Sequence, residues 1–360
     1  MRSPNQRLTW SVLAVVLVIA AFVLVTDVPV VPPRPVKHVG PPANAPVAVV
    51  TMGDSTISGE GAGDYTPSTN GANGDWCHRS PHAEIEDTSV VGVTKRFNLA
   101  CSGADSPVIG LGKTTHYTEP SQAAQLAPIA AHNRVAAIVV GDGANDDPHF
   151  SQIVNACIAA YFGHDQKGCS GGFTPAWQHK VDAMIPKVEK VLGDIRNVMT
   201  HAGYSPGSYQ LVLQSYAAPI GPDIAPGLDS IAGCPFQTAD LKWVRDTGIE
   251  ILDDGLAKAA STAGVRFLDL AGAGIGHEAC SGGNGAKGEW FTRLTVAWQD
   301  ISNADRAGHS LQSSFHPNAA GYAAFGQCLS AFLPTTNQSA ACLPGSDGVL
   351  RPAPTVGAGG

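Results

Sequence analysis

Charged residues are scarce in this chain of 360 residues, and its basic residues form no cluster. Asp, Glu, Lys and Arg together make up 14% of the residues, and the formal net charge is −8 at pH 7. These features argue against a surface that binds nucleic acid. No internal repeat is present either. With 44% apolar residues the chain can bury a full core, so we expect one large domain. Its 41 glycines predict many large loops, which suit a catalytic domain.

Cysteine pairs separated by two residues are also lacking, which disfavours a structural zinc site. The eight cysteines are an even number, as a disulfide framework requires. The alternative is eight buried free thiols in a cytosolic protein, and the N-terminal segment argues against it. Sequence alone does not decide how the cysteines pair.

Residues 1–46 differ in composition from the rest of the chain. Arg2 and Arg7 precede an uninterrupted apolar stretch from Trp10 to Val25, and a Pro-rich stretch follows it. No convincing small-x-small cleavage site lies close behind the apolar stretch, so we expect an uncleaved signal-anchor rather than a cleaved signal peptide. The chain is then exported and anchored in the cell envelope with its catalytic domain outside, or secreted if the N-terminus is cleaved.

These features divide the chain into five predicted segments. They are a cytoplasmic N-terminus (1–7), a signal-anchor or transmembrane segment (8–26), a Pro-rich linker (27–46), a catalytic domain (47–343) and a disordered tail (344–360). The linker is expected to be an extended, semi-rigid spacer that holds the domain off the membrane.

Apolar stretches typical of β-strands alternate with helical patterns through the catalytic domain. Strands are predicted over residues 47–52, 96–100, 135–141, 209–216 and 265–270. Helices are predicted over residues 177–199, 241–263 and 318–333. Apolar strands that alternate with helices indicate an α/β fold with a parallel sheet covered on both faces.

Four polar sites fall at related places in this pattern. Gly53-Asp54-Ser55 directly follows the first predicted strand, and Gly103 and Asn145 come shortly after the second and third. His316 precedes the last predicted helix. Ligands of open α/β sheets bind beyond the carboxyl ends of the strands. These four sites are therefore expected to meet at one edge of the sheet.

The same positions resemble the four sequence blocks of the SGNH (GDSL) hydrolases. The blocks are Gly53-Asp-Ser55, Gly103, Gly143-x-Asn145-Asp146 and His316-Pro317. Their surroundings resemble the branch of secreted bacterial lipases and esterases, in Gly53-Asp-Ser-Thr-Ile-Ser-Gly-Glu-Gly61, Cys77-His-Arg-Ser80 and Asn98-Leu-Ala-Cys-Ser-Gly-Ala104. The resemblance covers roughly residues 47 to 334. It implies a three-layer α/β/α, flavodoxin-like fold with a central five-stranded parallel sheet.

The resemblance also implies a role for each of these residues. Ser55 is the expected nucleophile, and His316 is the base that activates it. The backbone N–H groups of Ser55 and Gly103 and the side-chain amide of Asn145 are the expected oxyanion donors. The resemblance also implies that the cysteines pair in sequence order, and each such pair would close a local loop. The pairs are Cys77–Cys101, Cys157–Cys169, Cys234–Cys280 and Cys328–Cys342.

One position departs from the family pattern. Members with a full triad carry Asp three residues before the His, where this chain has Ser313. Some relatives in the secreted branch orient the imidazole with a backbone carbonyl, so we expect a Ser55–His316 dyad with the Ser313 carbonyl as the orienting group. Asp54 and Asp142 are expected to support a turn and a loop end, and no metal or cofactor is expected.

Two other serines, Ser170 and Ser205, lie in Gly-x-Ser-x-Gly sequences. A nucleophile elbow of that type needs a strand before the serine and a helix after it. Neither serine is predicted to have those neighbours, and both are interpreted as structural.

The chain is interpreted as an exported serine esterase or lipase, a carboxylic ester hydrolase that acts on acyl esters of lipids or of cell-envelope glycans. Two alternatives stay open. An acyltransferase would pass the same acyl group to a sugar hydroxyl of the envelope, and a non-catalytic protein of this fold would bind carbohydrate or lipid. The expected partners are the acyl ester substrate and, through the N-terminal helix, the membrane.

Overall fold

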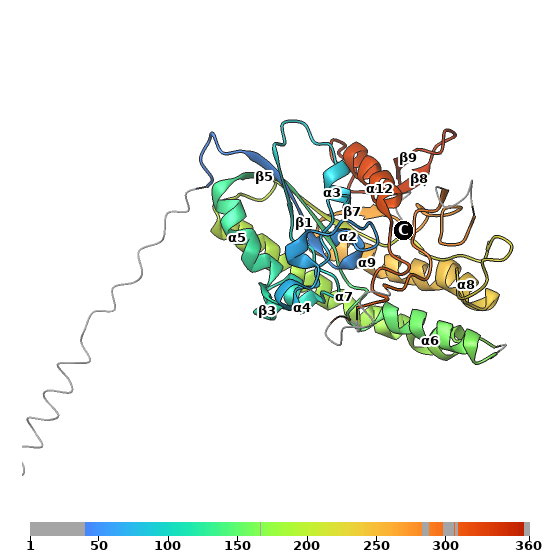
Figure 1. Ribbon diagram of the computed structural model, residues 1–360. Coiled ribbons are helices and arrows are strands. Elements are labelled where there is room, and N and C mark those ends of the chain that lie inside the picture. Colours follow the sequence, from blue (N-terminus) through green and yellow to red (C-terminus); the bar gives the residue numbers. More distant parts are fainter. Residues whose placement is uncertain (1–39, 166, 283–287, 298–305, 307–308, 356–360) are drawn as a thin grey trace, which may run out of the picture. The chain divides into compact units, whose positions relative to one another are not determined.

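The central sheet has seven strands in the spatial order β2-β1-β5-β6-β7-β8-β9 (Figure 1). The strands are β1 (Val47–Gly53), β2 (Lys95–Asn98), β5 (Arg134–Gly141), β6 (Gln210–Gln214), β7 (Arg266–Asp269), β8 (Ser339–Pro344) and β9 (Leu350–Pro354). Neighbouring strands from β2 to β8 are parallel, and β9 is antiparallel to β8. The computed structural model behind this description covers residues 40–165, 167–282, 288–297, 306 and 309–355.

The α/β class and all five predicted strands are confirmed, but the prediction of five strands, all parallel, is wrong. β8 and β9 extend the sheet beyond β7. The prediction of a disordered tail is wrong for residues 350–354, which form β9. The sequences of β8 and β9 carry Ala and Pro in place of branched apolar residues, so they give no strand signal. Pro is tolerated in β9 because that strand lies at the edge of the sheet.

Helices cover both faces of the sheet, as predicted for three layers. The α-helices are α2 (Ser55–Ser58), α3 (Glu84–Asp87), α4 (Ser106–Ile109), α5 (Gln122–His132), α6 (Phe150–Phe162), α7 (Ser170–His201), α8 (Thr238–Trp243), α9 (Glu250–Ala263) and α12 (Ala319–Phe332). Shorter or wider turns form η1 (Pro67–Thr69), η2 (Ala72–Gly74) and the π-helix η3 (Val244–Ile249). A small hairpin, β3 (Thr115–His116) with β4 (Glu119–Pro120), lies apart from the main sheet.

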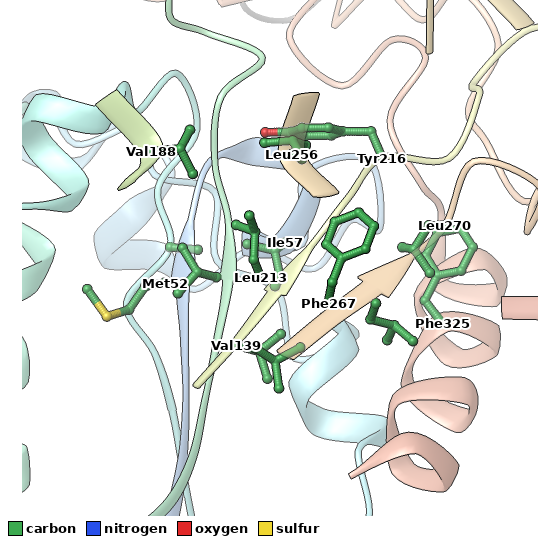
Figure 2. Close-up of a cluster of buried hydrophobic side chains, with 14 of the residues drawn as sticks. Met52, Ile57, Val139, Val188, Leu213, Tyr216, Leu256, Phe267, Leu270 and Phe325 are labelled. Atoms are coloured by element: carbon green, nitrogen blue, oxygen red, sulfur yellow. The ribbon is translucent and has the colours of Figure 1, made fainter. Parts of the chain in front are cut away.

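The two faces of the sheet are covered by different helices (Figure 1). On one face α7 packs against both α5 and α9, and on the other α3 packs against α12. Side chains of β6 alternate between these faces. Leu213 lies in the cluster with Val188 of α7 and Leu256 of α9 (Figure 2), whereas Gln214 contacts Glu84 of α3.

Helix α7 buries the apolar stripe predicted from its sequence. Its buried side chains are Trp177, Val181, Met184, Ile185, Val188, Val191, Leu192, Ile195 and Met199. The helix is longer than predicted at both ends, since it begins at Ser170 and ends at His201. The indole N–H of Trp177 donates to the carbonyl of Gly248 at 3.0 Å, so this large side chain is buried without an unpaired donor.

All eight cysteines lie in disulfides, and the pairs are those implied by the resemblance. They are Cys77–Cys101, Cys157–Cys169, Cys234–Cys280 and Cys328–Cys342. The last pair joins α12 to β8 and so attaches the added edge of the sheet to the preceding helix. The first ties the loop after η2 to the segment that follows β2.

The predicted segments 1–7 and 8–26, and residues 27–39 of the predicted linker, lie outside the described residues. Among the residues that the structure does describe, no helix has both the length and the apolar character needed to cross a membrane.

Glu84 is a fully buried acid between the sheet and α3. The amide Nε2 of Gln214 donates to its Oε2 at 2.7 Å, and within the described chain its Oε1 has no partner. Burial raises the pKa of Glu84 to about 7, because the charged carboxylate loses its water. In the unfolded chain the same group ionises near its ordinary pKa of 4.5.

Replacement of Glu84 by Gln should remove a pH-dependent loss of stability. The folded state binds the proton more tightly than the unfolded state, so the free energy of unfolding falls as the pH rises from 4.5 through about 7. The stability of Glu84→Gln relative to the parent protein should increase by up to about 3 kcal/mol between about pH 5 and pH 8. Urea unfolding of the oxidised protein measures it. Asp87→Asn, an exposed change on the same helix, should show no such trend.

Candidate active site

Ser55 lies at the carboxyl end of β1, where the chain turns sharply into α2. Gly53 has φ +142°, and a Cβ there would lie 2.1 Å from the carbonyl oxygen of Gly141, so no other residue fits this close approach. Asp54 caps α2, and its Oδ1 accepts from the backbone N–H of Thr56 at 2.9 Å. The turn therefore places Ser55 as the first residue of α2, at the strand end where ligands of such sheets bind.

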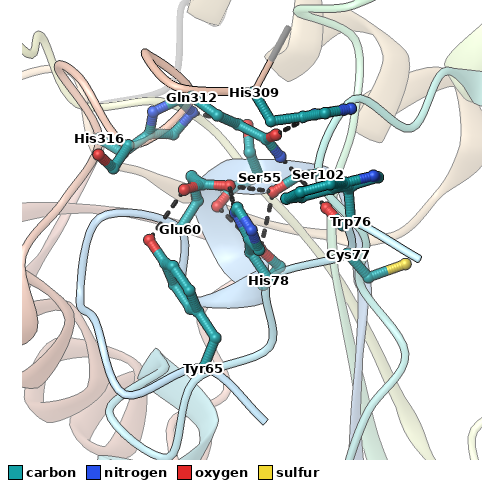
Figure 3. A network of polar contacts seen from close by, with 12 residues as sticks. Ser55, Glu60, Tyr65, Trp76, Cys77, His78, Ser102, His309, Gln312 and His316 are labelled. Atoms are coloured by element: carbon teal, nitrogen blue, oxygen red, sulfur yellow. Dashed lines mark hydrogen bonds and ion pairs between the residues drawn. The ribbon is translucent and has the colours of Figure 1, made fainter. Parts of the chain in front are cut away.

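His316 meets Ser55 across the edge of the sheet. Its Nε2 lies 2.8 Å from the hydroxyl oxygen of Ser55, which Figure 3 also labels. Its Nδ1 lies 3.0 Å from the carbonyl oxygen of Ser314. A carbonyl can only accept, so the ring proton sits on Nδ1 and Nε2 is free to accept from the Ser55 hydroxyl. This is the arrangement that a base needs to activate a serine.

The orienting carbonyl belongs to Ser314, and the prediction of Ser313 is wrong. The Ser313 carbonyl accepts from the hydroxyl of Thr292 and from the backbone N–H of His316 at 3.4 Å. Both bonds close the tight turn before His316, in which Phe315 has φ +59°. The carbonyl of Ser313 is thus used within the turn, and the next one in the chain faces the imidazole.

The three predicted oxyanion donors line one cavity with Ser55 and His316. Within the described chain, neither the Ser55 nor the Gly103 backbone N–H has a hydrogen-bond partner. The Asn145 amide donates one hydrogen to the carbonyl of Ala104 at 3.0 Å, and its second is unused there. Gly103 has φ +78°, a conformation that favours glycine. Donors are therefore available where a substrate oxygen would enter.

The cavity at Ser55 has a volume of about 360 Å³, and most of its walls are apolar. Side chains from α6 and α9, from the loop before α12 and from the ends of β6 and β7 form these walls, among them Val154, Ile158, Tyr216, Leu252, Leu270, Phe291, Leu294 and Phe315. The Ser55 hydroxyl and the predicted oxyanion donors line the same cavity. The shape suits a group with one polar reacting centre and an apolar extension.

Two buried aspartates flank the loop that carries Asn145. The Ser106 hydroxyl lies 2.9 Å from Asp142 Oδ2 and 2.5 Å from Asp146 Oδ2. The Ser106 hydroxyl has a single hydrogen and can donate it to only one of the two carboxylates. The contact with the other aspartate is a hydrogen bond only if that aspartate is protonated and donates to the hydroxyl oxygen. Burial raises the pKa of Asp146 to about 6, and burial and then the charge of Asp146 raise the pKa of Asp142 well above its ordinary value. Asp142 therefore supports a loop end, as predicted.

Several residues that hold this site were not predicted. Gln122 pairs with Gly53, accepting from its N–H and donating to its carbonyl, each at 2.7 Å. The Tyr216 hydroxyl donates to Asp54 at 2.7 Å, and the Tyr322 hydroxyl lies 3.0 Å from the Ser55 carbonyl. No local pattern marks these residues, because each acts on a partner at least 69 residues away in the chain.

The structural interpretation of the two other Gly-x-Ser-x-Gly serines agrees with their positions. Ser170 begins α7, with its backbone N–H bonded to Asp240, and Ser205 is exposed in the loop after α7. Two groups of side chains in the described residues could share a cation: Cys157 with Cys169 and Asp240, and Asp75 with Cys77 and Glu119. Their cysteines are in disulfides, and none of these residues lines the cavity at Ser55.

Comparison with known proteins places the chain among ester hydrolases. A family model described as "GDSL-like Lipase/Acylhydrolase family" matches residues 51–324. "Lipase 2" of Streptomyces coelicolor is 25% identical over 293 residues, which are 79% of this chain and 85% of that protein. The crystal structure of phospholipase A1 from Streptomyces albidoflavus NA297 superposes with a TM-score of 0.50 at 22% identity, and covers 77% of this chain and 94% of its own. The similarity to this phospholipase structure shows a shared fold only.

Thr292 should prove to be a positioning residue for the base. Its hydroxyl bonds the Ser313 carbonyl, and its backbone N–H bonds the carbonyl of His316 at 2.9 Å. Thr292→Val keeps the shape but removes the hydroxyl, so the imidazole is held less firmly and kcat should fall about tenfold with little change in KM. Steady-state kinetics on a p-nitrophenyl ester measure this. Ser313→Ala should retain most activity, and equal losses in both variants would contradict this account.

Proposed function

The chain belongs to the GDSL-like lipase/acylhydrolase family and is an ester hydrolase, and we propose that Ser55 and His316 carry out its reaction. The Ser55 oxygen attacks the ester carbonyl while His316 Nε2 takes its proton. The backbone N–H groups of Ser55 and Gly103 and the Asn145 amide stabilise the negative oxygen that forms. His316 then returns the proton to the leaving alcohol. Water, activated by His316, releases the acid and restores Ser55.

One observation carries this proposal. The Ser55 hydroxyl lies 2.8 Å from His316 Nε2, and the other ring nitrogen is held at 3.0 Å from the Ser314 carbonyl. These contacts set both the position and the tautomer of the base. Ser55 and His316 come from opposite ends of the domain, so their approach is a product of the whole fold.

The substrate is proposed to be an acyl ester of a lipid or of a cell-envelope glycan, with its acyl group in the apolar cavity. Burial of methylene groups against Val154, Ile158 and Phe291 contributes about 0.8 kcal/mol per group. The ester reaches Ser55 at the polar end of the cavity. Longer acyl groups gain more binding energy until they fill the space.

The protein is proposed to act outside the cytoplasm. Four disulfides support export, because such bonds persist in oxidising compartments. We propose that segment 8–26, which lies outside the described residues, directs export and anchors the chain. The catalytic domain then extends from residue 47 at least to the end of β9, since β1 and β9 belong to the same sheet.

Substitution of either member of the dyad should abolish hydrolysis. Ser55→Ala and His316→Ala should each lower kcat/KM for p-nitrophenyl esters by at least about a thousandfold, because the nucleophile and its base act as a unit. Ser205→Ala, an exposed serine in a similar sequence context, is the matched control and should keep full activity. If the parent protein releases p-nitrophenol only when a sugar is present, and the acyl group is then found on a hydroxyl of that sugar, the acyltransferase alternative replaces this proposal.

A bulky side chain in the wall of α6 should shorten the preferred acyl chain. Val154→Trp fills the apolar end of the cavity, so kcat/KM for p-nitrophenyl octanoate should fall about tenfold or more while that for the acetate changes by less than about twofold. Gln152→Trp places the same side chain on the exposed side of the helix and should leave the ratio unchanged. An unchanged ratio in Val154→Trp would place the acyl group elsewhere.

A further inference from the structure

Glu60 is a buried carboxylate beside the dyad that the reaction above does not use. It is 0% exposed and accepts three hydrogen bonds (Figure 3). His78 Nδ1 and the Ser102 hydroxyl each lie 2.7 Å from its Oε2, and the Tyr65 hydroxyl donates to its Oε1 at 2.9 Å. Burial opposes the charged form, but the hydrogen bonds from His78 and Ser102 hold the pKa of Glu60 below its ordinary value. Glu60 is therefore ionised at neutral pH.

The charge of Glu60 is not cancelled by His78. The His78 side chain is buried, and its Nε2 has no partner in the described chain. A protonated ring would bury an N–H group at Nε2 without an acceptor, which is costly, whereas a neutral ring leaves only a lone pair there. The ring is thus neutral, with its proton on Nδ1 directed at Glu60. One net negative charge remains on the carboxylate.

Glu60 lies close to both members of the dyad. The Tyr322 hydroxyl is 2.9 Å from the Glu60 carbonyl and 3.0 Å from that of Ser55. The next residue, Gly61, packs directly on the base: a Cβ on Gly61 would lie 2.9 Å from His316 Cβ. Figure 3 shows the Glu60 carboxylate near Ser55 and His316. A buried charge at this place acts on the imidazole with little screening by water.

A negative charge near the dyad would stabilise the positive charge that forms on His316 during the reaction. When Ser55 attacks, His316 becomes positively charged, and a full triad would balance that charge with an aspartate. Here the carbonyl of Ser314 orients the ring but is neutral. We propose that Glu60 supplies the missing negative charge through space and stabilises the imidazolium form of His316 during acyl transfer. This inference rests on the proposed function of Ser55 and His316.

Other ionisable groups face this region, and none of them is assigned the role of stabilising the imidazolium form of His316. Asp54 also lies near His316, but burial raises its pKa, and its carboxylate oxygens accept from Thr56 in the cap of α2 and from the Tyr216 hydroxyl. Asp64, Arg306 and His309 line the neighbouring cavity with Glu60 and His78, and none of the three lines the cavity at Ser55. Tyr65 and Tyr322 are neutral donors, because burial first, and then the charge of Glu60, raise the pKa of each.

The test compares pH profiles of the full-length, oxidised protein and three variants, with p-nitrophenyl butyrate as substrate. Glu60→Gln should lower kcat about tenfold with little change in KM, and should move the acid limb of kcat/KM about one unit to lower pH, because an imidazole without a nearby negative charge binds its proton less tightly. Glu60→Asp, whose shorter side chain holds the charge farther away, should move the limb in the same direction by less. Ser102→Ala removes one hydrogen bond but keeps the charge, and should leave the limb in place.

A purely structural role for Glu60 would lower kcat without moving the acid limb. An unmoved limb in Glu60→Gln therefore overturns the inference, and if that variant does not fold, an unmoved limb in Glu60→Asp overturns it. Failure of the proposed function gives a different result, since Ser55→Ala or His316→Ala would then retain activity. If both are inactive while the Glu60 variants keep the parent's limb, only the role of Glu60 is lost.

Discussion

The hydrogen bond between the Ser55 hydroxyl and His316 Nε2 is the contact on which the rest of the site depends. It joins the turn after β1 to the loop before α12, which lie at opposite ends of the domain sequence. Each end is fixed by a separate set of bonds: Gly53 and Asp54 hold the serine turn, and Thr292 and Ser314 hold the histidine. The parallel sheet brings these two sets to one edge, because all of its strands from β2 to β8 point their carboxyl ends the same way.

Orientation and charge compensation of the base are divided between different groups in this protein. A triad aspartate performs both tasks with one side chain. Here a neutral backbone carbonyl sets the tautomer of His316, and the inferred source of negative charge is a separate residue, Glu60. Burial removes the water around the Glu60 carboxylate, and three protein donors replace that water with hydrogen bonds. The Cys77–Cys101 disulfide joins the residues directly before two of those donors, His78 and Ser102, so the network depends on a covalent link.

Local sequence patterns sufficed for the strands that form the middle of the sheet and for the order of the four blocks. Buried parallel strands are apolar throughout, which makes β1 and β5 easy to predict, and a Gly-Asp-Ser turn after a strand needs no knowledge of distant residues. The strands β8 and β9 lack that signal, because they carry Ala and Pro in place of branched apolar residues. The contribution of Gln122, Tyr216 and Tyr322 could not be predicted either, since nothing near them in the sequence differs from ordinary core residues.

What the sequence by itself determined is an α/β chain with Ser55, Gly103, Asn145 and His316 at the ends of its elements, and eight cysteines in an even framework. Only the tertiary structure decided how the base is held. The choice between the carbonyls of Ser313 and Ser314 follows from a turn closed by Thr292, and the nearness of Glu60 to His316 follows from packing of Gly61 on the base. Such choices depend on contacts between segments far apart in the chain, and a sequence pattern records only what lies within one segment.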